Sequence, residues 1–274
     1  MVITSKEGAF VSEPSKFRNW IEADPNAEFP AGACVYHECV LCVRVCCGIV
    51  QFAIPDTVNH VRFVRDLYEL CSDVNTRYTV PVLWDTVKKT IVSNESADIV
   101  RMFNSSFSHL VSSALDLYPG DLREKIDEVN DWIYNDINNG VYKCGFASKQ
   151  EAYDEAVANL FAGLDRVEAL LSTQRFLMGD RLTESDLRLF ATLIRFDEVY
   201  YVHFKTNKKR IEEYPNLSNI PQITDTVNMQ HIKLHYYGSH THLNSFGIVP
   251  VGPNADLLAK HDRARFPAAN LPVQ

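Results

Sequence analysis

Residues 78–104 read Tyr-Thr-Val-Pro-Val-Leu-Trp-Asp, a short polar turn, and then Thr-Ile-Val-Ser-Asn-Glu-Ser-Ala-Asp-Ile-Val-Arg-Met-Phe-Asn. The β-branched and apolar residues on either side of the turn at 85–89 predict two short strands. The run at 93–96 then offers capping side chains, and apolar residues with helical spacing follow it. The stretch therefore predicts a strand, a turn, a second strand and a helix.

Two features of this stretch suggest chemistry. Pro81 lies inside a strand pattern, where it removes a hydrogen-bond donor, so it belongs at an edge, at a bulge or after a cis bond. Glu95 and Ser96 lie at a predicted helix start, where backbone N–H groups point outward and favour a bound carboxylate. Taken alone, an edge-strand proline and an ordinary helix cap explain both features.

Together, the Thr-Val-Pro strand, the second strand and Glu-Ser at a helix start resemble the glutathione-binding half of a glutathione transferase. The full sequence of residues 78–104 is similar to that of one branch, the Xi-class enzymes or glutathionyl-hydroquinone reductases, which resemble the Omega class. The resemblance implies that Val80, before cis Pro81, pairs its backbone with the cysteinyl part of glutathione. It also implies that Glu95 and Ser96 hold the γ-glutamyl carboxylate and amine, with glutathione as cosubstrate.

The resemblance covers residues 8–33 and about 61–260. The sequence Phe-Arg-Asn-Trp-Ile at 17–21 is similar to the N-terminal extension of the branch. An extended arm laid over a domain is the alternative interpretation, because this region has aromatic residues but no sustained periodicity. In the branch, tyrosines of Glu-Ala-Tyr and His-Tyr-Tyr-Gly-Ser-His contact quinone-type substrates, which implies Tyr153 and Tyr236 or Tyr237 here. Phenol side chains suit a hydroquinone because the rings stack and the hydroxyls exchange hydrogen bonds.

The resemblance breaks at residues 34–60. The family carries a catalytic Cys-Pro-Trp-Ala there, but this chain has no such motif, and the nucleophile's place falls on Arg44. The stretch is also several dozen residues too short, so we expect an incomplete domain. Cys42 and Cys46 are candidate nucleophiles by position only. They lie in a Val/Leu/Ile/Cys run typical of a buried strand, where a thiol is usually an inert small hydrophobe.

The predicted fold class is α/β plus all-α, the glutathione transferase fold. We expect an N-terminal extension at 1–33, a truncated thioredoxin-like glutathione-binding domain at 34–105, and an all-helical domain with an extended tail at 106–274. Within the helical part, the pattern predicts one helix ended by Asn139-Gly140 and another over 148–173. Thr183 and Asp186 form a structural cap of the next helix rather than a catalytic pair.

Composition limits the other possibilities. The 274 residues are 46% hydrophobic and 23% charged, as in a globular protein, and the net charge of −8 argues against a nucleic-acid surface. The sequence contains no apolar run long enough for a membrane helix and no signal-peptide core, so we expect a cytoplasmic protein. The odd number of cysteines, seven, argues against a disulfide framework.

Two patterns in the sequence have metal-ligand spacing. Cys39-x-x-Cys42 could be a zinc half-site or a redox pair, but no second half-site with a common zinc-fold spacing accompanies it, and an apolar strand explains the run better. His231 and His235 share a helical face, but no acidic third ligand is placed nearby. We therefore expect no metal.

Three hypotheses of function remain. The chain is a reductase of glutathionyl-hydroquinones that acts through a cysteine–glutathione mixed disulfide, resolved by a second glutathione. Alternatively, it is a catalytically dead glutathione-binding or interaction protein, because the nucleophile motif is absent. The third hypothesis, which we favour for residues 34–60, is a mis-spliced or frame-shifted exon in the sequence of an active reductase. Members of the family are usually homodimers, and we expect one here.

Overall fold

The structure is a computed structural model that describes residues 4–31, 34–37, 56–72, 78–110, 115–217, 226–254, 256, 262 and 265–268. The chain divides into two compact units. Glu13–Asp116 and Gly238–Thr241 form the first, which we call the α/β unit. Met1–Ser12, Leu117–Tyr237 and His242–Gln274 form the second, which we call the helical unit.

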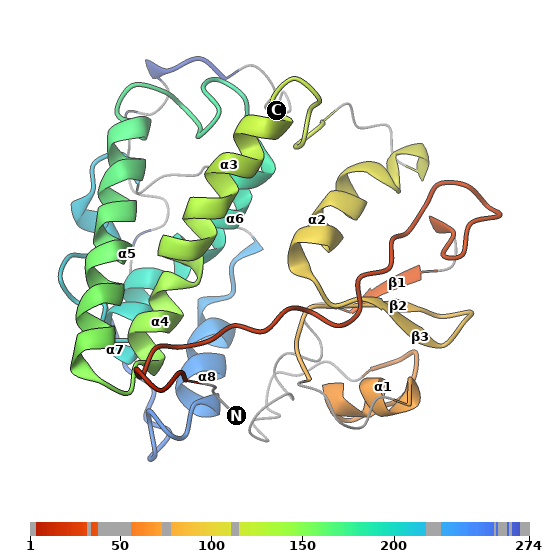
Figure 1. Cartoon of the computed structure of the whole chain (residues 1–274), viewed down its shortest axis with the longest axis horizontal. Helices are drawn as coiled ribbons and strands as arrows, with labels where there is room; N and C mark the ends of the chain where they lie inside the picture. Colours follow the sequence, from red (N-terminus) through yellow and green to blue (C-terminus); the bar gives the residue numbers. More distant parts are fainter. Residues whose placement is uncertain are drawn as a thin grey trace. The chain divides into compact units, whose positions relative to one another are not determined.

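The α/β unit is built on an antiparallel sheet in the order β1-β2-β3, with helices before and after the last two strands (Figure 1). The strands are β1 (Cys34–His37), β2 (Val82–Asp85) and β3 (Thr90–Ser93), and the helices are α1 (Val64–Leu70), α2 (Ser96–Ser105) and the short η3 (Ser108–Leu110). Asp85 closes the turn between β2 and β3, since its Oδ1 accepts the backbone N–H groups of Val87 and Lys88 at 2.8 Å each. The predicted strand, turn, strand and helix are confirmed.

Alternation along the strands places a helix on each face of the sheet. One face packs Leu83 and Val92 with Ile99 and Met102 of α2. The other face packs a second cluster against α1, made of Val82, Trp84 and Ile91 from the sheet with Val64, Leu67 and Tyr68 from the helix. Because successive strand residues point to opposite faces, both faces are buried and the unit is a three-layered α/β structure.

Residues 15–22, which we call the N-terminal arm, extend the sheet beyond β3. The backbone N–H of Asn19 donates to Val92 O at 3.0 Å, and the N–H of Asn94 donates to Phe17 O at 3.0 Å. Ile21 is fully buried in the core on the α2 side. The arm therefore satisfies backbone groups at an edge that would otherwise be open.

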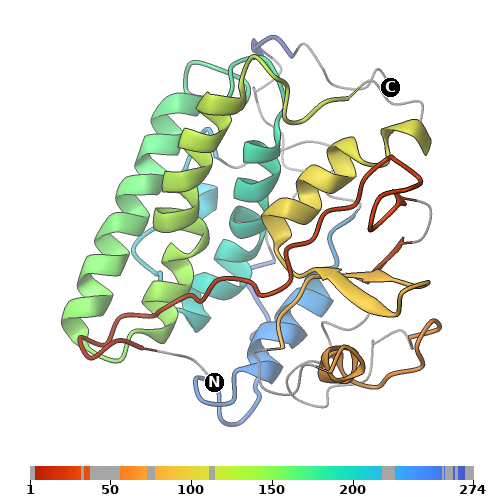
Figure 2. The same cartoon turned by 45° about the vertical axis from the view of Figure 1, so that its right-hand side comes forward.

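The helical unit consists of helices packed around one apolar core, and Figures 1 and 2 both show α3, α5 and α6 side by side. Its elements are α3 (Arg123–Ile133), the π-helical turn η4 (Tyr134–Asn138), α4 (Gly140–Phe146), α5 (Gln150–Leu171), α6 (Glu184–Arg195), the π-helical turn η5 (Phe196–Tyr200), α7 (Tyr201–His203), η6 (Ile211–Glu213) and α8 (Met229–Ser239). The predicted helix over 148–173 is confirmed as α5.

The predicted helix end at Asn139-Gly140 is wrong. The chain continues through the π-helical turn η4 into α4, which begins at Gly140. Ile137 and Val141 on either side are fully buried, and Gly140 itself is buried beside Leu160 of α5. Because tertiary packing supplies most helical stability in proteins, this buried face outweighs the local glycine signal.

The predicted cap of α6 is confirmed. Asp186 is buried, and its carboxylate accepts the Thr183 N–H at 3.0 Å, the Thr183 hydroxyl at 3.1 Å and the Leu177 N–H at 2.8 Å. The carboxylate thus fixes both the helix start and the turn that precedes it, which is a folding role.

We expect Asp186→Ala to lower the free energy of unfolding by about 3 kcal/mol, because it removes a cap and leaves buried donors unsatisfied. Urea unfolding followed by circular dichroism measures the change. Asp131→Ala, at an exposed position on α3, is the matched control and should change stability by less than about 0.5 kcal/mol. Equal effects of the two substitutions would contradict the capping role.

Candidate functional site

Asn94 brings the two predicted binding segments of the α/β unit together. Its Nδ2 donates to Thr79 Oγ1 and to Tyr68 Oη, each at 2.9 Å, and Tyr68 Oη donates to Thr79 O at 2.8 Å. Thr79 is followed by the cis Val80-Pro81 bond, and Asn94 is followed by Glu95 and Ser96. The structure therefore places the loop of Val80-Pro81 next to the start of α2 at Glu95-Ser96.

Glu95 and Ser96 differ in how they are held. Glu95 is half-buried and caps α2, since its Oε1 accepts the Ala97 N–H at 3.1 Å and its Oε2 accepts the Ser15 hydroxyl at 2.9 Å. Ser96 is the first residue of the helix, and its side chain is exposed. A helix start favours an anion, and a carboxylate accepts hydrogen bonds from an ammonium. The two residues can therefore bind the two charged groups of an amino-acid moiety.

The predicted substrate tyrosines all lie in the helical unit, around residues 203–205. Tyr153 of α5 is half-buried, and its hydroxyl donates to Lys205 O at 2.7 Å. Tyr236 and Tyr237 of α8 are buried, and the Tyr237 ring stands edge-on to His203 with the centroids 4.8 Å apart. Burial, followed by the Glu198 carboxylate, raises the pKa of Tyr237 to about 12, so its hydroxyl stays protonated.

Tyr236 is the middle of a chain of three phenols. Its hydroxyl lies 2.6 Å from that of Tyr142 and 2.8 Å from that of Tyr200. Burial raises the pKa of both Tyr200 and Tyr236, so these hydroxyls remain neutral donors and acceptors. Two hydrogen bonds among three hydroxyls leave one O–H to donate outside the trio. Tyr142 is the half-buried member, so it is the one that a bound molecule can reach.

Sequence reasoning did not find Tyr142. It lies two residues after Gly140, where the helix was predicted to have ended, so no packed face was expected there. The available signal was the four-residue spacing of Tyr142 and Phe146, whose rings lie 6.1 Å apart in the structure. Phe204 packs against both rings, and Gly145 allows this approach because a Cβ there would lie 2.2 Å from Phe204 Cδ1.

The candidate nucleophiles Cys42 and Cys46 lie outside the described residues. Of the cysteines that the structure does describe, Cys144 is buried and Cys71 is half-buried, and both are free thiols. Burial raises the pKa of Cys144 to about 12, which keeps it a protonated, unreactive thiol. Cys71 Sγ accepts the Ile91 N–H at 3.3 Å, so it forms part of the packing between α1 and β3.

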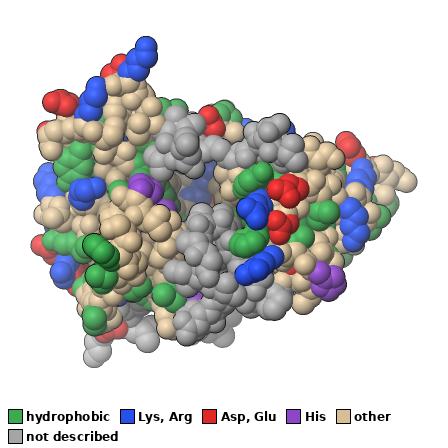
Figure 3. Space-filling model, turned by 90° about the horizontal axis from the view of Figure 1, so that it is seen from below, with side chains coloured by type: hydrophobic (Ala, Val, Ile, Leu, Met, Phe, Trp, Pro, Cys, Tyr) green, Lys and Arg blue, Asp and Glu red, His purple; other side chains and the backbone are tan. Residues whose placement is uncertain are grey.

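Within the described parts of the chain, His, Cys, Asp and Glu side chains form no group of three or more that could hold a metal ion. Among the same residues, no helix is both long and apolar enough to span a bilayer. On the face shown in Figure 3, basic and acidic side chains are interspersed, in keeping with the mixed charge of the sequence.

Cys144 should resist alkylation by iodoacetamide at pH 8 in the native protein, because its thiolate fraction is negligible and its sulfur is buried. Peptide mass spectrometry after native labelling measures the modification at each cysteine. In urea the same peptide should label fully, and this serves as the control. Rapid native labelling at Cys144 would contradict the assignment.

His203 gives the fold a pH dependence with a defined sign. Burial, aided by nearby Lys205 and His242, lowers the pKa of His203 to about 4, whereas an unfolded histidine has its ordinary value of 6.5. As pH falls from 6.5 to 4, the unfolded chain therefore takes up a proton that the folded chain does not, and stability is lost. Relative to His203→Gln, the wild type should lose about 3 kcal/mol of unfolding free energy over this range.

Urea unfolding of both proteins at pH 4, 5, 6 and 7 measures this difference. The gap between the two curves should change mainly between pH 6.5 and pH 4. Parallel curves across the range would show that His203 is not buried as a neutral side chain.

Residues 150–219 match the family profile of the glutathione S-transferase C-terminal domain. The chain is 42% identical to glutathionyl-hydroquinone reductase YqjG of Escherichia coli (strain K12), over 94% of this chain and 93% of that protein. It is 39% identical to glutathionyl-hydroquinone reductase PcpF of Sphingobium chlorophenolicum, over 91% of each chain. The YqjG alignment spans 308 positions although this chain has 274 residues, so YqjG carries several dozen residues that this chain lacks.

Solved structures agree in fold. The glutathione transferase Xi from Phanerochaete chrysosporium is 42% identical with a TM-score of 0.83, covering 92% of this chain and 100% of that one. The glutathione-bound structure of YqjG is 41% identical with a TM-score of 0.84, covering 91% of this chain and 97% of that one.

Proposed function

Because the chain belongs to the Xi-class glutathione transferases, the family of the glutathionyl-hydroquinone reductases, we propose that it binds glutathione through Val80, Pro81, Glu95 and Ser96. The predicted fold class, α/β plus all-α in the glutathione transferase fold, is confirmed by the same relatives. The observation that carries the proposal is the Asn94 amide, which joins the loop of Thr79 to the start of α2. Glutathione is the ligand of YqjG in its bound structure.

Glutathione is a good chemical match for these loops. Its γ-glutamyl end carries a carboxylate and an ammonium on one carbon, and the start of α2 offers backbone N–H groups beside the Glu95 carboxylate. The backbone of Val80, two residues before β2, would pair with the cysteinyl part in the manner of an added strand. Charge pairing thus fixes one end of the peptide and backbone pairing fixes its middle.

The reaction we propose for the family chemistry is reduction of a glutathionyl-hydroquinone. A cysteine thiol attacks the glutathionyl sulfur, the carbon–sulfur bond breaks, the ring takes up a proton, and a protein–glutathione mixed disulfide forms. A second glutathione then releases glutathione disulfide and restores the thiol. We propose Tyr153, Tyr236 and Tyr237 of the helical unit as the residues for quinone-type rings, with Tyr142 as the accessible hydroxyl.

The absence of Cys-Pro-Trp-Ala supports a second candidate function, a catalytically dead glutathione-binding or interaction protein. Cys42 and Cys46 are the candidates for the nucleophile by position, and neither is followed by proline. We further propose a cytoplasmic homodimer that binds neither nucleic acid nor membranes. The acidic net charge of −8 supports the first of these exclusions.

Glu95→Gln should raise the dissociation constant for glutathione by about 10-fold or more, because it removes the charge that faces the ligand amine. Isothermal titration calorimetry on wild type and variant measures this change. Glu69→Gln, at an exposed position of α1, is the matched control and should bind as the wild type does. Wild-type protein that does not bind glutathione would refute the proposed function.

Turnover of a glutathionyl-hydroquinone distinguishes the two candidates. Wild-type protein that binds glutathione and reduces the substrate is a reductase, and substitution of Cys42 or Cys46 by Ser should then abolish turnover. Binding without turnover supports the dead glutathione-binding protein. Sequencing the transcript across the codons for 30–65 completes the test, since a longer exon that encodes Cys-Pro-Trp-Ala would assign the reaction to the parent protein.

A further inference from the structure

Ser15 of the N-terminal arm contacts the proposed glutathione site from a distant point in the sequence. Its hydroxyl lies 2.9 Å from Glu95 Oε2 and 3.3 Å from Asn94 O. Resting on the proposed function, we propose that Ser15 is a positioning residue that orients the Glu95 carboxylate toward the ammonium group of the bound γ-glutamyl moiety. The N-terminal arm thereby takes part in the glutathione site through its contact with Glu95.

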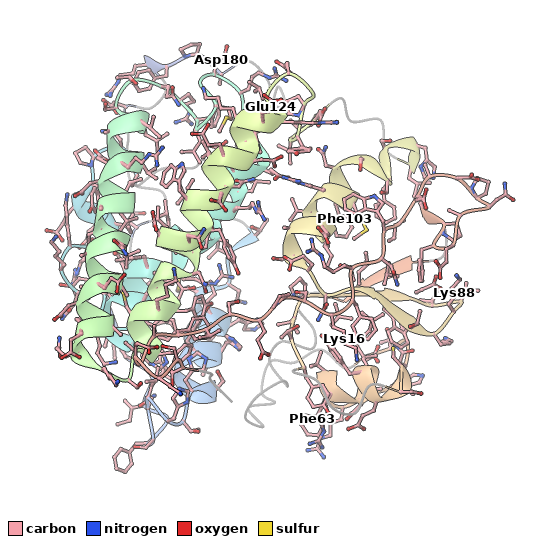
Figure 4. All side chains as sticks on the ribbon, viewed as in Figure 1. Lys16, Phe63, Lys88, Phe103, Glu124 and Asp180 are labelled. Carbon is pink, nitrogen blue, oxygen red and sulfur yellow. The ribbon has the colours of Figure 1, made fainter. Side chains whose placement is uncertain are left out.

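The arm is fixed tightly next to Ser15. The backbone of Phe17 exchanges hydrogen bonds with Asn94, since Phe17 N donates to Asn94 Oδ1 and Asn94 N donates to Phe17 O, each at 3.0 Å. The Phe17 ring also stands edge-on to Tyr68, with the centroids 5.8 Å apart. Lys16 lies between Ser15 and Phe17, and its exposed side chain is labelled in Figure 4, which shows where this part of the arm lies. Ser15 therefore has a fixed place relative to Glu95.

The two contacts of the Glu95 carboxylate come from different directions. Oε1 is held by the N–H of Ala97 in its own helix, and Oε2 is held by Ser15 from the arm. Each carboxylate oxygen has two acceptor positions, so both oxygens retain one for a ligand. Ordering a free glutamate side chain costs rotamer entropy. Fixing it before the ligand arrives removes part of that cost from binding.

This role has a chemical signature. Glu95 faces the ammonium of the ligand, so Ser15 should affect only ligands that carry that ammonium. A desamino analogue, glutaryl-cysteinylglycine, keeps the carboxylates, the thiol and the backbone but lacks the amine. If Ser15 instead only tethers the arm to the sheet, its loss should weaken both ligands equally.

The experiment compares Ser15→Ala, Ser15→Thr and Ser12→Ala in the full chain, with calorimetric titration of glutathione and of the desamino analogue. Ser15→Ala should raise the dissociation constant for glutathione by about 3- to 10-fold and leave that of the analogue unchanged. Ser15→Thr keeps the hydroxyl and should restore binding to within about twofold. Ser12→Ala, at an exposed position on the same N-terminal stretch, should bind as the wild type does.

The double variant Ser15→Ala/Glu95→Gln tests whether the effect passes through Glu95. It should bind glutathione no more weakly than Glu95→Gln alone, since two residues that act through one contact are not additive. Additive losses, or equal losses for glutathione and the analogue, would overturn the inference. Unchanged binding by Ser15→Ala would overturn it while leaving the proposed function intact. Wild-type protein that binds neither ligand would refute both.

Discussion

The α/β unit depends on one buried side chain, the amide of Asn94. The residue is only 5% exposed, and its side chain donates to Tyr68 and Thr79 and accepts from Phe17. A buried amide with unmet hydrogen bonds would be costly, so these partners are held together as a set. Through this set, three parts of the chain that are far apart in sequence meet: the N-terminal arm, helix α1 and the loop before β2.

The N-terminal arm, which is hydrogen-bonded to Asn94, supports the small sheet at its open edge. The described sheet has three strands, and β3 would present an open edge if the arm were absent. The arm closes that edge with backbone hydrogen bonds and buries Ile21 against α2. A bidentate pair between Arg18 and Asp98, at 2.8 and 2.9 Å, adds a further link on the surface. The N-terminal arm is therefore part of the domain's architecture, in addition to its contact with the binding loops.

The parts of the fold that the sequence predicted correctly are those governed by local signals. The strands, turn and helix at 78–104, helix α5, and the Thr183 cap all rest on spacing and on side chains a few residues apart. The errors and omissions involve long-range contacts. The helix was wrongly ended at Gly140, where Leu160 packs beside the chain, and Tyr142 was missed because it follows that predicted end. The contact between Ser15 and Glu95 joins positions 80 residues apart, and no local sequence pattern predicts it.

Binding and chemistry are therefore separable in this chain on physical grounds. The loops that would hold glutathione are fixed by Asn94, Tyr68, Thr79 and the arm, none of which belongs to the stretch at 34–60 that lacks the family's nucleophile motif. The described part of this network satisfies its own hydrogen bonds without a contribution from a catalytic cysteine. A change in the nucleophile region would thus leave in place the side chains that we propose to orient the peptide. For this reason the proposed glutathione affinity, rather than turnover, is the property that the described residues bear on most directly.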